Sequence, residues 1–195
     1  MCLPANGIKC MPSLWYLSFY RCHRLECLIE GIQHLTALRF LGFNNCKSLI
    51  SLPQGMKHLT VLEYLDITNC EKLNLMEGDD YPTRLRTLCI WSLPQLVSLP
   101  QGLKGSTNTL QVLRFFFFFF FFCENLGVLP KWLLDLSSLH KLHILHCRKL
   151  SSLLEGMDRL TALRELRIKG CLELRRDYEW EVSKDWGKMV KFSFY

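Results

Sequence analysis

Leucine returns in this chain at a nearly constant interval, and this periodicity restricts the possible folds more than any other feature of the sequence. Segments of the form Leu-x-x-Leu-x-apolar begin at residues 14, 38, 62, 85, 110, 139 and 163. Successive starts are 24, 24, 23, 25, 29 and 24 residues apart. Self-similarity at such a period is typical of repeat architectures, in which each unit buries its apolar edge against its neighbours.

Cysteine keeps the same interval. The chain has ten cysteines, and six of them recur 24 residues apart in two series: Cys22, Cys46 and Cys70, then Cys123, Cys147 and Cys171. A disulfide framework or a metal site has no reason to keep this spacing, whereas a repeated structural position does. A small buried thiol placed where the chain turns away from a strand could donate weakly to neighbouring backbone carbonyls. Cys22 and its near neighbour Cys27 are interpreted as a core residue and a loop residue.

The combined pattern is L-x-x-L-x-L-x-x-C, the strand segment of a leucine-rich repeat. A strand period of two turns Leu65 and Ile67 inward and leaves Tyr64, Asp66 and Thr68 on the opposite face. The sequence therefore predicts an α/β fold: a leucine-rich-repeat solenoid in the form of a right-handed horseshoe. We expect about seven repeats, with a parallel sheet on the concave side and an irregular or short helical convex side.

Two turn signals recur on the convex side. Gly55, Gly102 and Gly156 occupy one position of the repeat, where a tight turn tolerates positive φ. Leu-Pro pairs at 52–53, 99–100 and 129–130 predict an extended residue just before the convex segment.

The single irregular interval, of 29 residues, contains eight consecutive phenylalanines at 115–122. Removing five residues returns Cys123 and Leu126 to repeat positions, so we interpret the tract as a repeat's strand carrying a five-residue insertion. Identical side chains leave open which five are extra. The tract has the uncharged, proline-free character of aggregating segments. It is either a bulge in the repeat or the product of slippage or misreading in a homopolymer stretch of the gene.

The ends of the chain differ from its middle. Residues 1–13 resemble the tail of a preceding repeat, and the first strand's core edge is expected to be open. We assign residues 1–174 to the repeat array and 175–195 to a C-terminal cap, where mixed charge accompanies Tyr178, Trp180 and Trp186. Residues 192–194 could add a short strand, and residues 78–80 are expected to form a loop.

Composition excludes several classes of function. The 24 basic and 18 acidic residues are interspersed along the chain and give a formal charge of +6, which argues against a nucleic-acid-binding face. No apolar run reaches the ~18 residues that a membrane span needs. The first residues lack a basic segment followed by an apolar one, as a secretory signal would have. We therefore expect a cytoplasmic protein without a membrane span.

Several repeats carry a longer consensus, L-x-x-L-x-I-x-x-C-x-x-L-x-x-L-P-x-G-M-x-x-L-T-x-L, nearly complete at residues 38–61 and 139–162. Together with the closing segment around Asp185 and Trp186, these repeats resemble the C-terminal region of plant intracellular nucleotide-binding leucine-rich-repeat disease resistance proteins. The resemblance implies a defence role in which the repeats sense pathogen effectors or modified host proteins and hold the receptor inactive. The implied partners are a pathogen effector, a guarded host protein, or a receptor's nucleotide-binding domain.

No motif in the chain predicts catalysis or a cofactor. A phosphate-binding loop is absent from the sequence, because Gly187-Lys188 has no matching upstream glycine. His140, His143 and Cys147 lie along one expected strand, where their offsets point to opposite faces, so we predict no metal site. Nucleophile and base arrangements do not rise above chance. We therefore expect a non-enzymatic protein with no cofactor.

The concave face is the remaining candidate site, and we predict that it binds protein. Aromatic residues dominate its N-terminal strands and basic residues its C-terminal strands, a composition that suits protein-binding anchors. The predicted contact residues are Tyr16, Tyr20, Phe40, Tyr64, Asp66, Trp91, Arg114, Lys141, His143, Arg167 and Lys169. Two alternatives remain open: a truncated or pseudogene fragment without its own binding role, and a substrate adaptor of a ubiquitin ligase.

Overall fold

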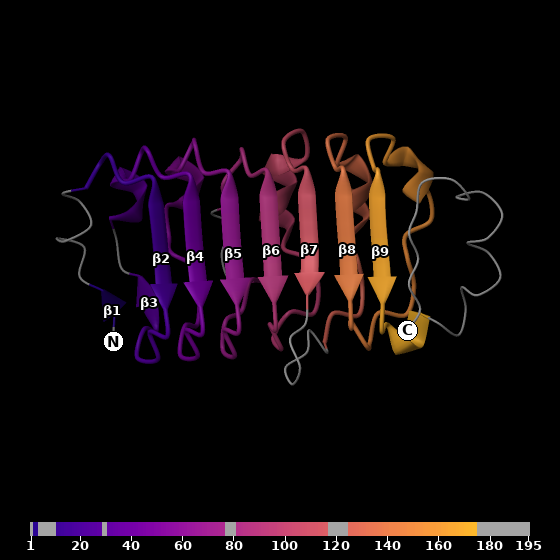
Figure 1. Ribbon diagram of the computed structural model, residues 1–195, viewed down its shortest axis with the longest axis horizontal. Helices are drawn as coiled ribbons and strands as arrows, with labels where there is room; N and C mark the ends of the chain where they lie inside the picture. Colours follow the sequence, from indigo (N-terminus) through magenta and orange to yellow (C-terminus); the bar gives the residue numbers. More distant parts are fainter. Residues whose placement is uncertain (1, 4–10, 29–30, 77–80, 117–124, 175–195) are drawn as a thin grey trace.

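The computed structural model describes residues 2–3, 11–28, 31–76, 81–116 and 125–174. Its main element is one parallel sheet of seven strands in sequence order, which run side by side along the length of the molecule (Figure 1). The strands are β2 (Tyr16–Tyr20), β4 (Phe40–Asn44), β5 (Tyr64–Thr68), β6 (Thr87–Trp91), β7 (Val112–Phe116), β8 (Lys141–Leu145) and β9 (Glu165–Lys169). One strand per repeat confirms the predicted leucine-rich-repeat solenoid.

The register of the sheet follows from the repeat period. Because the units have nearly equal length, equivalent residues pair directly, as Tyr16 does with Phe40 and Phe40 with Tyr64. Leu41 and Leu65 lie beneath them and are completely buried. The apolar core therefore runs without interruption from repeat to repeat, and each leucine row is closed by the next unit.

Short 3-10 helices cover the other side of the solenoid, as expected. They are η1 (Ile32–His34), η2 (Met56–His58), η3 (Gln101–Ser106), η4 (Lys131–Asp135) and η5 (Met157–Arg159). Gly55 and Gly156 precede η2 and η5 with φ of 85° and 83°, which confirms the prediction for both glycines. The prediction was wrong for Gly102, which lies inside η3 and is not among the positive-φ residues. In that repeat the helix is longer and begins directly after the extended Pro100, so Gly102 lies within the helix and not before it.

A second left-handed position follows the strands of the main sheet other than β7, after which the chain leaves the described residues, and it was not predicted. Its members are Arg21, Asn45, Asn69, Ser92, His146 and Gly170, with φ between 51° and 66°. The ladder continues beyond the strand through the backbone N–H groups of Arg21, Asn45, Asn69 and His146. That of Asn45 donates to the Thr68 carbonyl at 2.9 Å, and that of Asn69 to the Trp91 carbonyl at 2.8 Å. The chain thereby turns out of the sheet without losing its hydrogen bonds.

The repeated cysteines have the predicted structural role. Cys46, Cys70 and Cys171 are buried, and their thiols donate to the carbonyls of Phe19, Phe43 and Ile144 in the preceding repeat, at 3.6, 3.7 and 3.7 Å. The neighbouring Cys46 thiol and burial raise the pKa of Cys70, which keeps it in the donating thiol form. The interpretation of Cys27 was wrong: this residue is disulfide-bonded, whereas Cys22 is free and half-buried.

The structure narrows the position of the phenylalanine insertion. Phe115 is fully buried and pairs with Ile144, and Phe116 completes β7. Beyond the tract, Leu126 is again fully buried on a core position. The extra residues therefore follow Phe116, and residues 117–124 lie outside the described part of the chain.

The repeat that begins at residue 62 is completed by residues from outside the consensus. Thr83 stands where the preceding repeats have the fully buried Leu35 and Leu59, but it is exposed, whereas Tyr81 is buried and its hydroxyl donates to the Leu75 carbonyl. Ser106 is also buried, and its hydroxyl donates to the Pro82 carbonyl at 2.7 Å. The loop expected at residues 78–80 lies outside the described residues, as do the 175–195 cap and the strand expected at 192–194.

The N-terminal end is less tightly packed, in line with the open edge expected there. Leu14 and Leu17 are only partly buried, whereas Leu38 and Leu41 at the same positions of the next repeat are fully buried. Separate from the main sheet, β1 (Cys2–Leu3) pairs in parallel with β3 (Cys27–Leu28). No helix within the described residues is long and apolar enough to cross a bilayer.

Candidate functional site

The concave face consists of the side chains that point away from the core, at the first, third and fifth residues of each strand. The register arranges them in three rows across the sheet. The first row is Tyr16, Phe40, Tyr64, Thr87, Val112, Lys141 and Glu165. The second is Ser18, Gly42, Asp66, Cys89, Arg114, His143 and Arg167. The third is Tyr20, Asn44, Thr68, Trp91, Leu145 and Lys169. All eleven predicted contact residues therefore lie on this face.

The N-terminal half carries a stack of aromatic rings. The ring centroids of Tyr16 and Phe40 are 4.4 Å apart with an interplanar angle of 12°, and those of Phe40 and Tyr64 are 5.0 Å apart at 21°. Parallel in-register pairing makes rings in one row stack, which stabilises each pair by about 0.5–1.5 kcal/mol beyond simple burial. Tyr20 remains more than half exposed at 59%. The N-terminal half of the concave face therefore presents rigid aromatic edges, and binding a partner would cost little further side-chain entropy.

Gly42 lies beside this stack. A Cβ at this position would come within 2.9 Å of Phe40 Cε1 and 3.1 Å of the Ser18 hydroxyl. The absence of a side chain at Gly42 therefore gives the Phe40 ring room to lie over the sheet. The composition of the row gave no sign of this role, because a glycine within a strand could equally mark a bulge.

A group of hydrogen-bonded side chains occupies the centre of the face. The Tyr64 hydroxyl lies 3.3 Å from Cys89 Sγ, and the Thr68 hydroxyl donates to Asp66 at 3.2 Å. Burial raises the pKa of Asp66, and burial together with the Cys89 contact raises the pKa of Tyr64. Cys89 is only 2% exposed, so its thiol takes part in packing more than in the accessible surface.

The C-terminal half is organised around Glu165. One of its carboxylate oxygens lies 2.6 Å from Arg167 Nε and 3.3 Å from His143 Nε2, and the other lies 3.4 Å from Lys141 Nζ. Although desolvation alone would raise it, the pKa of Glu165 is lowered by His143, Arg167 and Lys141. The spacing places Glu165 on the concave face, but the predicted contact residues did not include it, because only the basic residues of these strands stood out.

The basic residues of this half are not equally accessible. His143 is 3% exposed, and burial lowers its pKa despite the nearby Glu165. Arg114 Nε is buried without a hydrogen-bond partner among the described residues. Arg167 is exposed and Lys141 and Lys169 are half-buried. Counting Arg114, Lys141, Arg167 and Lys169 against Glu165, the half has an excess of three positive charges with His143 neutral.

Other histidines and cysteines do not form a second site within the described chain. His34 and His58 are exposed on the convex side, at the ends of η1 and η2. No cluster of three or more His, Cys, Asp or Glu side chains able to hold a metal ion occurs among the residues that the structure describes.

Comparison with known proteins supports the fold. No protein-family model matches the sequence, and no curated protein matches it. Among solved structures, the leucine-rich repeat domain of the type III effector XCV3220 (XopL) is similar, with a TM-score of 0.60 and 19% sequence identity. The similarity covers 89% of this chain and 66% of that one. The chain therefore has a leucine-rich-repeat solenoid fold and spans slightly less than two thirds of that domain's length.

Proposed function

We propose that this protein is a non-catalytic recognition scaffold that binds another protein across its concave face. The observation that carries the proposal is the division of this face into a preorganised aromatic half and a basic half. Aromatic anchors with arginine are the residues that protein interfaces favour at their energetic centres. Leucine-rich-repeat solenoids present extended concave surfaces of this kind to partner proteins.

The electrostatics of the face suggest how a partner would be oriented. An excess of positive charge at β7–β9 favours an acidic segment of the partner, while the Tyr16–Phe40–Tyr64 stack favours an apolar one. Complementary charge would contribute more to association rate and register than to affinity. The buried, unpaired Arg114 Nε offers one donor that a bound acceptor could satisfy.

The biological setting follows from the resemblance of the repeats to plant disease resistance receptors. We propose a cytoplasmic role in plant defence, with a pathogen effector, a guarded host protein or a receptor's nucleotide-binding domain as the partner. The free cysteines Cys46, Cys70, Cys147 and Cys171 are compatible with a reducing compartment. The disulfide at Cys27 points instead to an oxidising one.

The proposal is tested by comparing partner capture by three forms of the protein. The concave-face variant replaces Tyr16, Tyr64, Trp91 and Lys141 by Ala, and the control replaces the exposed convex residues Lys104 and Lys131 by Ala. Quantitative mass spectrometry of plant-extract pull-downs should find partners retained by the wild type and the control and lost by the concave-face variant. Unchanged capture of every partner by the folded concave-face variant would end the concave-face assignment.

A separate experiment addresses the defence role. The protein and its captured partner would be co-expressed in leaf tissue, with cell death and defence-gene induction as readouts. We expect the partner-dependent response to disappear with the concave-face variant and to persist with the convex control. A captured partner without any effect on either readout would leave protein binding standing and remove the defence assignment.

A further inference from the structure

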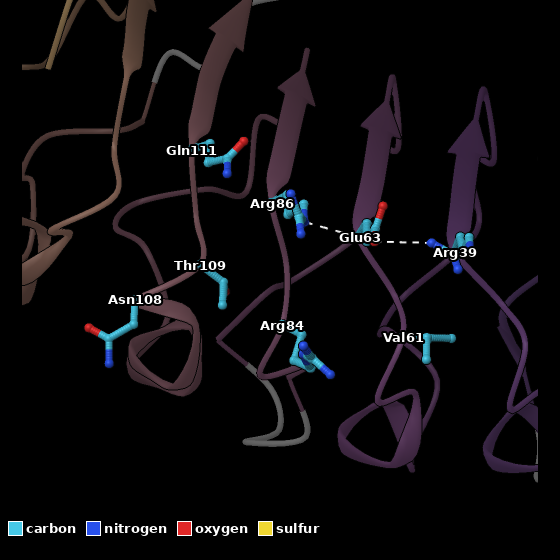
Figure 2. Close-up of a pocket in the computed structure, with 8 residues that line it drawn as sticks. All are labelled: Arg39, Val61, Glu63, Arg84, Arg86, Asn108, Thr109 and Gln111. Carbon is cyan, nitrogen blue, oxygen red and sulfur yellow. Dashed lines mark hydrogen bonds and ion pairs between the residues drawn. The ribbon is translucent and has the colours of Figure 1, made fainter. Parts of the chain in front are cut away.

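A pocket of about 300 Å³ lies at the edge of the sheet where the strands begin, beside the concave face (Figure 2). Its residues come from successive repeats: Arg39 precedes β4, Glu63 precedes β5 and Arg86 precedes β6. Arg84 lies two residues before Arg86 on the same connection. The amide side chains of Asn108 and Gln111 complete the polar part of the wall.

The charges of this pocket are unbalanced. The Glu63 carboxylate lies 3.2 Å from Arg39 Nη1 and 3.8 Å from Arg86 Nε, and the same oxygen serves both (Figure 2). Arg84 has no ion pair with any described residue. Among the described lining residues, three guanidinium groups and one carboxylate leave an excess of two positive charges. Each guanidinium has five N–H donors, so one carboxylate leaves most of them to water or to a ligand.

We propose that this pocket binds a phosphate group. The planar donor fork of arginine matches the oxygens of phosphate, and the excess of two positive charges balances a dianion better than a single carboxylate. The volume corresponds to about ten water molecules at about 30 Å³ each, so a phosphate can enter together with the group that carries it. The side-chain amides of Asn108 and Gln111 provide further donors. This site is separate from the concave face and does not depend on its function.

The geometry also assigns a role to Glu63. Its carboxylate holds Arg39 and reaches toward Arg86, but it would repel an incoming phosphate. Its removal should therefore tighten phosphate binding, the reverse of what loss of a structural ion pair would do. Because the side chains of Arg39 and Arg86 are 61% and 55% exposed, salt should weaken the interaction strongly.

The test measures binding to the full chain by calorimetry at low ionic strength. The probes are inorganic phosphate, a short peptide with one phosphoserine, and the same peptide unphosphorylated. The variants are Arg84→Gln, Arg86→Gln and Glu63→Gln, and the control is Arg164→Gln, which changes the equivalent residue before β9, outside the pocket. All four positions carry polar surface side chains, and circular dichroism would confirm that each variant folds.

We expect inorganic phosphate and the phosphoserine peptide to bind, and the unphosphorylated peptide not to bind. Loss of one charged donor should weaken phosphate binding about tenfold for Arg84→Gln or Arg86→Gln. Glu63→Gln should strengthen it, and Arg164→Gln should leave it unchanged. Tighter binding of the phosphopeptide than of phosphate would identify a phosphorylated protein side chain as the source, and the reverse would identify a free phosphate. Absence of phosphate binding, or an equal loss in Arg164→Gln, would overturn the proposal.

Discussion

Gly170 provides a sharp test of the left-handed turns that end the strands. Its φ is +66°, and a Cβ at this position would lie 2.3 Å from Nδ1 and 2.8 Å from Cε1 of the His146 ring. The substitution Gly170→Ala therefore introduces both backbone strain and a steric clash. The clash is with a side chain, so it can be relieved only by moving the His146 ring.

The expected loss of stability combines three contributions. The left-handed conformation costs a residue with a Cβ about 1–2 kcal/mol. Displacing the His146 ring from its rotamer adds about 0.5–1.5 kcal/mol. The Ala side chain also reduces the conformational freedom of the unfolded chain, which offsets about 0.4–1 kcal/mol of this loss of stability. We expect Gly170→Ala to lower the free energy of unfolding by about 2 kcal/mol, taking the middle of these ranges.

The assay is urea unfolding followed by circular dichroism, together with hydrogen exchange of the His146 amide, which donates to the Lys169 carbonyl. Gly127→Ala is the matched control, because a Cβ there meets its nearest atom at 3.7 Å, an ordinary contact. In a His146→Ala background the cost of Gly170→Ala should fall to about 1 kcal/mol as the clash disappears. An equal cost in both backgrounds, or no cost in either, would refute the reasoning.

Three further predictions concern titration and solubility. Burial raises the pKa of Asp66, so above the ordinary pKa of 3.8 the folded state binds more protons than the unfolded state, and stability falls as pH rises through that window. Asp66→Asn should therefore stabilise the protein at pH 7 in chemical unfolding. A destabilised variant would contradict this. Burial lowers the pKa of His143 and of His146, so stability should decline as pH falls below their ordinary pKa of 6.5. His143→Leu should reduce the dependence of the unfolding free energy on pH, measured by unfolding curves across that range. An unchanged pH dependence would count against this prediction. Deleting five phenylalanines from residues 117–122 should raise soluble yield, because the tract is apolar and uncharged, whereas a monodisperse full-length protein with no gain on deletion would show that the tract is harmless.

The periodicity of the sequence was sufficient to predict the sheet. In a parallel sheet built from units of equal length, equivalent residues must pair, so Tyr16, Phe40 and Tyr64 could be placed in one row from spacing alone. The same logic placed Cys46 and Cys70 at the turn after each strand and identified which residues lie on the concave face. The leucine pattern is local, and it is repeated in each unit, so every unit gives the same prediction.

Spacing did not predict how neighbouring side chains divide their contacts. The burial of His143 and the ion pairs that Glu165 makes depend on contacts with side chains from adjacent repeats, and these side chains share no motif. Gly55 and Gly102 both follow Leu-Pro-Gln, yet Gly55 precedes its 3-10 helix with positive φ whereas Gly102 lies inside a longer one. The charged residues of the pocket come from three successive repeats and look like ordinary solvated charges when read singly; they are Arg39, Glu63, Arg84 and Arg86.

The sequence by itself thus determined the solenoid, the register of its strands and the identity of its exposed rows, since a short-range apolar period imposes them on every unit. The tertiary structure alone decided which polar groups are buried, which charges are paired and where a pocket opens. These properties arise from contacts between residues about two dozen positions apart, and their energies depend on distance and solvent exposure that only the folded chain defines.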